Sequence, residues 1–336
     1  MRKLASLLML AAAATSAASP AMAWGSSGHR MIATEAMAAL PRDLPGFLRA
    51  QEAAVDVGEW SREPDRWRLA GPAHDTLRDG FHFAYADDDG KLGGGPTFAT
   101  LPATRAQFAE AVRKAGGDPE AVGYLPYAII DGWQQLAKDF VYWRADKAGL
   151  RLNADPRKQA WLAADQRRRE AQILLDAGLL AHYVGDATQP MHLTVHHDGW
   201  GDYPNPDGFT NAKVHIPYEG AYVGAAFRPE MVRDAMPAPH LLKGPIEAEV
   251  GTYLTEAAQE ARPWYRLEKD GGFAPGDPRG VRYTASRLGA AAGMLRDLIS
   301  SAWAASAAGK INYPVATIRD IEAGRVDAYT MLRGPD

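Results

Sequence analysis

The chain has 336 residues, of which 46% are hydrophobic, so it is long enough to bury a sizeable core. Its formal net charge of −4 argues against a protein that grips nucleic acid through a broad basic surface, and any phosphate-binding positive charge must be local. The absence of cysteine excludes disulfides and restricts a zinc site to His, Asp, Glu or backbone ligands, a set typical of catalytic sites.

The N-terminus has the layout of a secretory signal peptide. An Arg-Lys pair at 2–3 precedes an apolar stretch over 4–14 and a small-residue cleavage site at 21–23. The apolar stretch is too short to anchor the chain across a bilayer. We therefore expect residues 1–23 to direct export to the periplasm or the medium, and 24–336 to form the mature protein without stable membrane insertion.

Helical spacing of Ala, Leu, Gln, Arg and Glu dominates the rest of the chain, and strand patterns are scarce. Helices are predicted over 26–37, 104–115, 119–146, 157–187, 245–262, 280–308 and 315–331. Two Gly-, Pro- and Asp-rich stretches, 71–102 and 193–214, are long enough to be functional loops. The segment 263–280 is a candidate boundary, but the helices after it can pack into the same bundle. The predicted fold class is all-α: a single-domain multi-helix bundle with long active-site loops.

The strongest chemical signal is the block His182-Tyr-Val-Gly-Asp186-Ala-Thr-Gln-Pro-Met-His192. His182 and Asp186 are four residues apart on a predicted helix, so both side chains project from one face. Because an imidazole and a carboxylate are costly to bury without partners, a shared cation accounts for both. Pro190 ends the helix, and His192 can return as a third ligand.

A second His–carboxylate pair has the same spacing. His215 and Glu219 are four residues apart, and Pro217 between them is tolerated if a helix begins there. Either pair alone would favour a simple hydrogen bond on a helix surface. Two pairs and a flanking His within one region favour a metal site.

These motifs resemble the three-zinc superfamily that contains fungal and plant single-strand-specific nucleases and bacterial zinc-dependent phospholipases C. The resemblance runs over most of the chain and is densest at short motifs. They are Trp24-Gly-Ser-Ser-Gly-His29, Pro64-Asp65, Phe81-His82-Phe83, the block from His182 to His192, and His215 with Glu219.

The resemblance implies three zinc ions and assigns their ligands. One zinc would be held by Asp65, His82, His182 and Asp186, and a second by His192, His215 and Glu219. The third would be chelated by the α-amino nitrogen and carbonyl oxygen of Trp24, with His29 and a bridging Asp186. Trp24 can be such a ligand only after cleavage frees its amine. The other histidines are His74, His196, His197 and His240. We expect ordinary surface residues, and the alternative for His196 and His197, which are close to the site in sequence, is that they line the cleft.

The resemblance also implies a mechanism, in which a hydroxide activated by two zinc ions attacks phosphorus in line. Asp65 would act catalytically by orienting the water, and the third zinc would stabilise the leaving oxygen. The short separation of Trp24 and His29 matches the nucleases. Glu219, by contrast, matches the phospholipases, and Gly220 replaces an Asn that contacts substrate in the nucleases.

The favoured prediction is a monomeric endonuclease that hydrolyses single-stranded DNA or RNA, and nucleotide 3′-phosphates, to 5′-phosphate products. A zinc-dependent phospholipase C acting on phospholipid is the alternative, and an exported zinc-binding protein without turnover is a further one. Loop aromatics can stack on bases, contact acyl chains or pack beneath the loops. They are Phe81, Phe83, Tyr85, Trp200, Tyr203 and Phe209.

Overall fold

A computed structural model describes residues 24–69, 78–311 and 315–334. The predicted all-α class is confirmed, because helices make up most of the described chain. The described strands, β1 (Lys310–Ile311) and β2 (Ala316–Thr317), form one antiparallel pair in which Lys310 faces Thr317. The predicted signal peptide, residues 1–23, lies outside the described residues.

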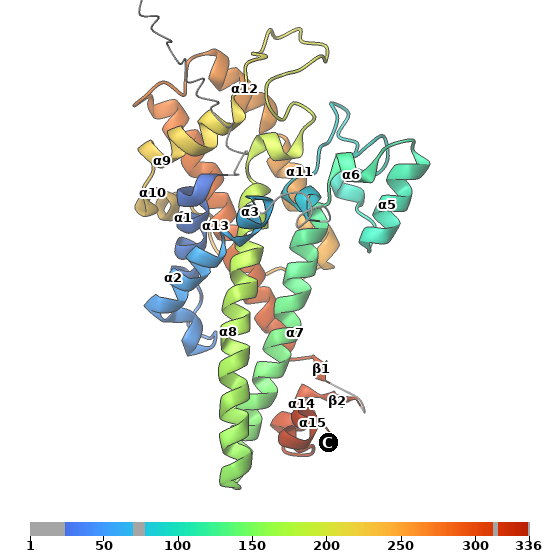
Figure 1. Cartoon of the computed structure of the whole chain (residues 1–336), viewed down its shortest axis with the longest axis vertical. Coiled ribbons are helices and arrows are strands. Elements are labelled where there is room, and N and C mark those ends of the chain that lie inside the picture. Colours follow the sequence, from blue (N-terminus) through green and yellow to red (C-terminus); the bar gives the residue numbers. More distant parts are fainter. Residues whose placement is uncertain (1–23, 70–77, 312–314, 335–336) are drawn as a thin grey trace, which may run out of the picture.

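Three long helices form the frame of the molecule: α7 (Leu125–Leu152), α8 (Pro156–Asp186) and α13 (Pro278–Ser306). Asp155 and Asp277 start α8 and α13 as N-caps, each followed by a proline at the first helical position, where the missing N–H costs nothing. Figure 1 shows α7 and α8 as an antiparallel pair whose lower half extends beyond the N-terminal helices, with α14 (Ile318–Glu322) and α15 (Ala328–Arg333) beside it.

The N-terminal helices α1 (Gly25–Ala38), α2 (Gln51–Trp60) and α3 (Glu63–Leu69) pack beside the C-terminal half of α8 (Figure 1). The remaining described helices are α5 (Arg105–Lys114), α6 (Pro119–Val122), α9 (Val223–Ala226), α10 (Pro229–Asp234), α11 (Ile246–Ala258) and α12 (Ala261–Lys269). Short 3₁₀ turns are η1 (Gly46–Arg49), η2 (Asp79–His82), η3 (Phe98–Thr100) and η4 (Pro190–Leu193), and η5 (Pro217–Tyr222) is π-helical.

Some predicted helices are interrupted. The predicted helix 119–146 is two helices, α6 and α7, because Gly123 between them has a φ of 94° and lies against the carbonyl oxygen of Phe83, where no Cβ fits. The predicted helix 245–262 is likewise α11 and the start of α12. The predicted helix 315–331 contains β2, α14 and most of α15 instead.

One large hydrophobic core runs through the described chain from Trp24 to Ala302, in agreement with a single domain. A smaller core joins the outer part of α7, through Val141 and Ala145, to Ile318 and Ile321 of α14. Among the described helices, none has the length and apolarity needed to cross a membrane.

Candidate metal centre

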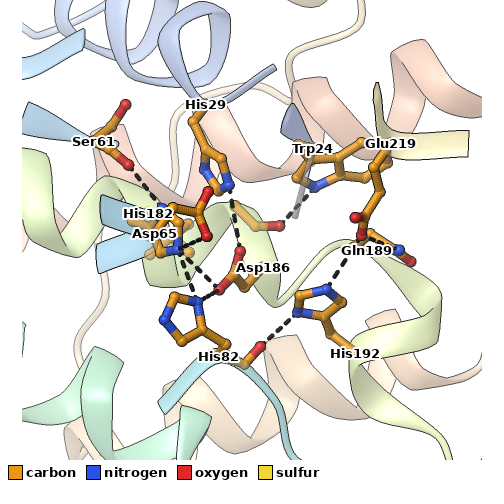
Figure 2. Close-up of polar contacts among 12 residues, drawn as sticks. Trp24, His29, Ser61, Asp65, His82, His182, Asp186, Gln189, His192 and Glu219 are labelled. Carbon is orange, nitrogen blue, oxygen red and sulfur yellow. Dashed lines mark hydrogen bonds and ion pairs between the residues drawn. The ribbon is translucent and has the colours of Figure 1, made fainter. Parts of the chain in front are cut away.

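The C-terminal end of α8 carries the first ligand pair of the site. His182 and Asp186 are both fully buried and project from one face of the helix, as their spacing predicts. The Nδ1–H of His182 donates to the carbonyl oxygen of Ser61, at 2.7 Å. The lone pair of the neutral ring is therefore on Nε2, which faces the other site residues (Figure 2).

Asp65 of α3 and His82 of η2 complete a first group with His182. His82 Nδ1 lies 3.0 Å from His182 Nε2 and 3.0 Å from Asp186 Oδ2, and Asp65 Oδ1 lies 3.9 Å from His182 Nε2. All four side chains are buried. The structure thus brings together the four residues that the resemblance assigned to one metal.

His29 forms a second group with His182 and Asp186. Its ring stacks on that of His182 with centroids 4.1 Å apart, and its Nε2 lies 3.5 Å from Asp186 Oδ1. Since Asp186 Oδ2 faces the first group, the two oxygens of this carboxylate face different groups, as a bridging ligand requires. Gly185 allows this approach, because a Cβ there would lie 2.9 Å from His29 Nδ1.

His192, His215 and Glu219 form a third buried group. The Nε2 atoms of the two histidines are 3.1 Å apart, and Glu219 Oε1 lies 3.2 Å from the first and 2.5 Å from the second. Pro217 begins the π-helix η5, not an ordinary helical turn, and this still places Glu219 beside His215. Such π turns are frequent at functional sites.

The ring orientations of these histidines suit a cation. His192 donates Nδ1–H to the carbonyl oxygen of His82 and His215 donates to that of His197, both at 2.5 Å. In the neutral rings, the facing Nε2 atoms therefore both carry lone pairs and cannot hydrogen-bond to each other. A metal ion between them satisfies both nitrogens and Glu219 together, and the Nδ1–H bonds fix the rings as metal-binding histidines require.

Burial governs the ionisation of the first group. It raises the pKa of Asp65 to about 7, against the opposing charge of His182, and raises the pKa of Asp186 well above its usual value. It also lowers the pKa of His82 and His182, so both rings stay neutral and can donate lone pairs. Nearby positive charges lower these two pKa values less than burial raises them, and a bound cation would supply the charge needed to keep both carboxylates ionised.

The third group is different, because its charges compensate each other. Burial acts to raise the pKa of Glu219, but His215 and His192 outweigh it and lower that pKa to about 2. Burial acts to lower the pKa of His215, but Glu219 outweighs it and raises it. Glu219 Oε2 remains without a hydrogen-bond partner among the described residues, as does Asp186 Oδ1.

Trp24 lies at the same site. Its indole is fully buried, and Nε1 donates to the carbonyl oxygen of Gly185 at 2.7 Å and to Thr188 Oγ1 at 3.2 Å. Its φ of 48° is unusual for a residue with a side chain, and such strain is typical of functional sites. Packing therefore anchors Trp24 next to Asp186. The proposed chelate by its amine depends on cleavage after residue 23 and stays a prediction.

Two further residues near the three ligand groups were not predicted from the sequence. Arg68 follows Asp65 by one helical turn, forms an ion pair with Asp79 at 2.7 Å, and its charge lowers the pKa of Asp65 and Asp186. Gln189 is fully buried; its Oε1 accepts from the Met191 N–H, which orients its amide so that Nε2 donates to Glu219 Oε1 at 2.5 Å. For Arg68, the signal in the sequence is its position three residues after Asp65 on the same helix. For Gln189, it is its position between the ligands Asp186 and His192.

The remaining histidines differ from one another. His240 is exposed, as predicted, and His74 lies outside the described residues. The prediction is wrong for His196, which is buried against the Trp200 ring at 3.6 Å with Nε2 3.2 Å from Asp88 Oδ1. His197 is exposed but stacks on Tyr85 with centroids 4.7 Å apart.

The loop aromatics also divide into two sets. Trp200 and Phe209 are buried and pack on Tyr265, so they support the loop 193–214 from below. Phe83 stacks on Tyr85 with centroids 4.4 Å apart, and the ring of His197 continues the stack on the other face of Tyr85. This three-ring stack is attached to the site at both ends, because Phe83 follows His82 and the His197 carbonyl binds His215.

Comparison of the chain with family models, curated proteins and solved structures finds no match. The three buried His, Asp and Glu groups are thus the main evidence on function, and they can hold several metal ions.

Proposed function

We propose that this chain is an exported three-zinc phosphodiesterase that hydrolyses single-stranded DNA or RNA, and nucleotide 3′-phosphates, to 5′-phosphate products. The observation that supports it most is the convergence of three buried imidazole–carboxylate groups around Asp186 and Glu219. Donor sets of imidazole and carboxylate without thiolate suit zinc in catalytic sites, and several adjacent metals are typical of phosphoester hydrolysis.

The chain's own residues supply the remaining functions. Zinc, when bound, provides Lewis-acid activation of water and of a phosphoryl oxygen. Asp65 Oδ1 is buried without a hydrogen-bond partner among the described residues, so it is available to accept a proton from the attacking water and orient it. Arg68, held by Asp79, offers a fixed positive charge to the phosphoryl oxygens.

The stack of Phe83, Tyr85 and His197 favours nucleic acid over phospholipid. Tyr85 has Phe83 on one face and His197 on the other, so the outer face of the exposed His197 ring is the one on which an unpaired base would stack, with little sequence preference. A cavity of about 270 Å³ is lined in part by Tyr85, His197 and Tyr203. Phospholipase C remains the second candidate, because Glu219 followed by Gly220 departs from the nuclease pattern.

The test is to purify the protein whose N-terminus is Trp24, measure bound zinc, and assay three substrates. These are single-stranded DNA, a nucleoside 3′-monophosphate and a choline phospholipid. We expect three zinc ions per chain and phosphate products from the first two substrates. Turnover of the phospholipid alone would assign the second candidate, and zinc without turnover of any ester would leave a metal-binding protein.

The bridging role of Asp186 has its own test. In Asp186→Asn, we expect two zinc ions to be lost together, because its two oxygens face different groups. Loss of a single zinc, measured by elemental analysis, would reject the bridge.

A further inference from the structure

The outer half of the α7–α8 pair, residues 144–170, is strongly basic; we call it the cationic arm. It contains eight Lys or Arg and four Asp or Glu, a formal charge of +4 in a chain whose total is −4. One of its acids, Asp146, is buried, and burial raises its pKa to about 8, so it is largely uncharged at neutral pH. The arm is thus positive on an otherwise acidic protein.

Several of the arm's cations have no internal partner. Four are paired: Arg144 with Glu322, Lys158 with Asp327, Arg168 with Asp165 and Arg169 with Asp139. The other four, Lys147, Arg151, Arg157 and Arg167, are exposed and form no ion pair within the part of the chain that the structure describes, although Arg151 donates to the carbonyl oxygen of Glu322. Their charge is available to an anionic partner.

Three of the arm's cations, one of them paired, line a groove. Arg144, Lys147 and Arg151 are spaced three and four residues apart, so they share one face of α7. Together with Trp143 and Glu322 they line a cavity of about 260 Å³. Three like charges on one helix face repel one another, and a single carboxylate offsets them incompletely. A phosphate group in the groove would reduce that repulsion.

The arm lies far from the metal groups. Gly149 of α7 packs on Leu162 of α8, and Leu162 precedes Asp186 by 24 residues. At 1.5 Å per helical residue this is ~36 Å. Figure 1 shows the arm at the opposite end of α8 from α1 and α3, which carry His29 and Asp65. A partner that contacts both places must be long and anionic along its length.

We propose that the cationic arm binds the phosphodiester backbone of single-stranded nucleic acid while another part of the same strand occupies the metal centre. This proposal rests on the proposed function, since it concerns the same substrate. A membrane surface is the less suitable partner, because a membrane-binding helix needs an apolar face. Within 144–170, all of it described, Leu152 is the exposed large hydrophobic residue.

The test compares a long substrate with one that cannot reach the arm. We would measure kcat/KM of the zinc-loaded protein on a 30-nucleotide single strand and on a dinucleoside monophosphate, at several salt concentrations. In the triple variant Lys147→Gln, Arg157→Gln, Arg167→Gln, we expect about a tenfold loss on the 30-mer and no change on the dinucleotide. Three lost phosphate contacts should also reduce the salt slope by about 2.

A matched variant controls for net charge. Arg113→Gln, Arg228→Gln, Lys243→Gln removes three exposed charges outside the arm that also form no ion pair among the described residues, and it should leave both substrates unaffected. An equal loss in this control, or an equal loss on the dinucleotide, would overturn the proposal. A second outcome would also overturn the proposal. In it, vesicles of phosphatidylcholine and phosphatidylglycerol bind the wild type but not the arm variant, and the arm variant cleaves the 30-mer as fast as the wild type does.

Failure of the proposed function would be recognised separately. If the wild type cleaves neither nucleic-acid substrate, the proposed activity is wrong. The arm is then tested by fluorescence anisotropy on the uncleaved 30-mer, where equal affinity of the wild type and the arm variant would reject it.

Discussion

Asp146 provides a quantitative test of the interior of the α7–α8 pair. Its side chain is buried, and neither carboxylate oxygen has a hydrogen-bond partner among the described residues. Burial raises its pKa to about 8, with Asp165 adding to the rise and Arg169 opposing it. The folded protein therefore holds the proton of Asp146 much more tightly than the unfolded chain does.

The sign and size of the effect follow from linkage. Because the folded pKa is raised above the ordinary value of 3.8, the stability from the bound proton is fully present below pH ~4 and is lost as the pH rises towards 8. Each pH unit in this window lowers the free energy of unfolding by about 1.4 kcal/mol. At pH 7 the accumulated loss is about 4 kcal/mol.

Asp146→Asn removes this titration, since an amide is neutral at every pH. The variant minus wild-type difference in unfolding free energy should therefore rise by about 4 kcal/mol between pH 4 and pH 7, whatever constant offset the amide adds. Urea unfolding followed by circular dichroism at pH 4, 5, 6, 7 and 8 measures it. Asp43→Asn, at an exposed position, is the matched control. A difference that stays constant with pH would refute the reasoning.

Three further substitutions test the metal centre. Gly185→Ala should displace His29, because the new Cβ would lie 2.9 Å from His29 Nδ1. The zinc content, measured by elemental analysis, should fall by one ion, and the circular dichroism of the helices should not change. Gln189→Met keeps the side chain's size but removes the donor to Glu219, and competition with a zinc chelator should show about 10–100-fold weaker binding of one zinc. Arg68→Gln should lower kcat/KM on single-stranded DNA about 10²-fold with zinc content unchanged, and loss of zinc would instead make Arg68 a structural partner of the ligands.

Much of the fold followed from local signals in the sequence. Helical spacing predicted α8 and α13 to within two residues at each end, whereas the predicted helix 119–146 begins six residues before α7 and ends six residues short of it. The interruption at Gly123 could not be predicted, since it depends on Phe83, which is distant in sequence. The helices α2 and α3 were not predicted. With 10 and 7 residues, they are too short for their apolar residues to show a clear helical period.

The site shows the same division between local and long-range information. The pairs His182–Asp186 and His215–Glu219 follow from a spacing of four residues. Asp65, His82 and His29 reach the site from other elements, and only the family resemblance indicated them. His196 is buried between a local partner, Trp200, and a distant one, Asp88, which is 108 residues away, and the distant contact has no signal in the local sequence.

The metal centre and the arm depend on cations in different ways. The buried ligands come from α1, α3, η2, α8, η4 and the segment around η5, so their unpaired nitrogens and carboxylates meet only in the folded chain. Binding of a metal by these groups would therefore be coupled to the packing of these elements. The arm is instead held by the apolar contacts of α7 with α14, which involve none of the ligands. Loss of a bound metal should thus loosen the packing around His29 and Asp65 before it affects the arm. The net charge of −4 is the sum of +4 in the arm and −8 in the rest of the chain.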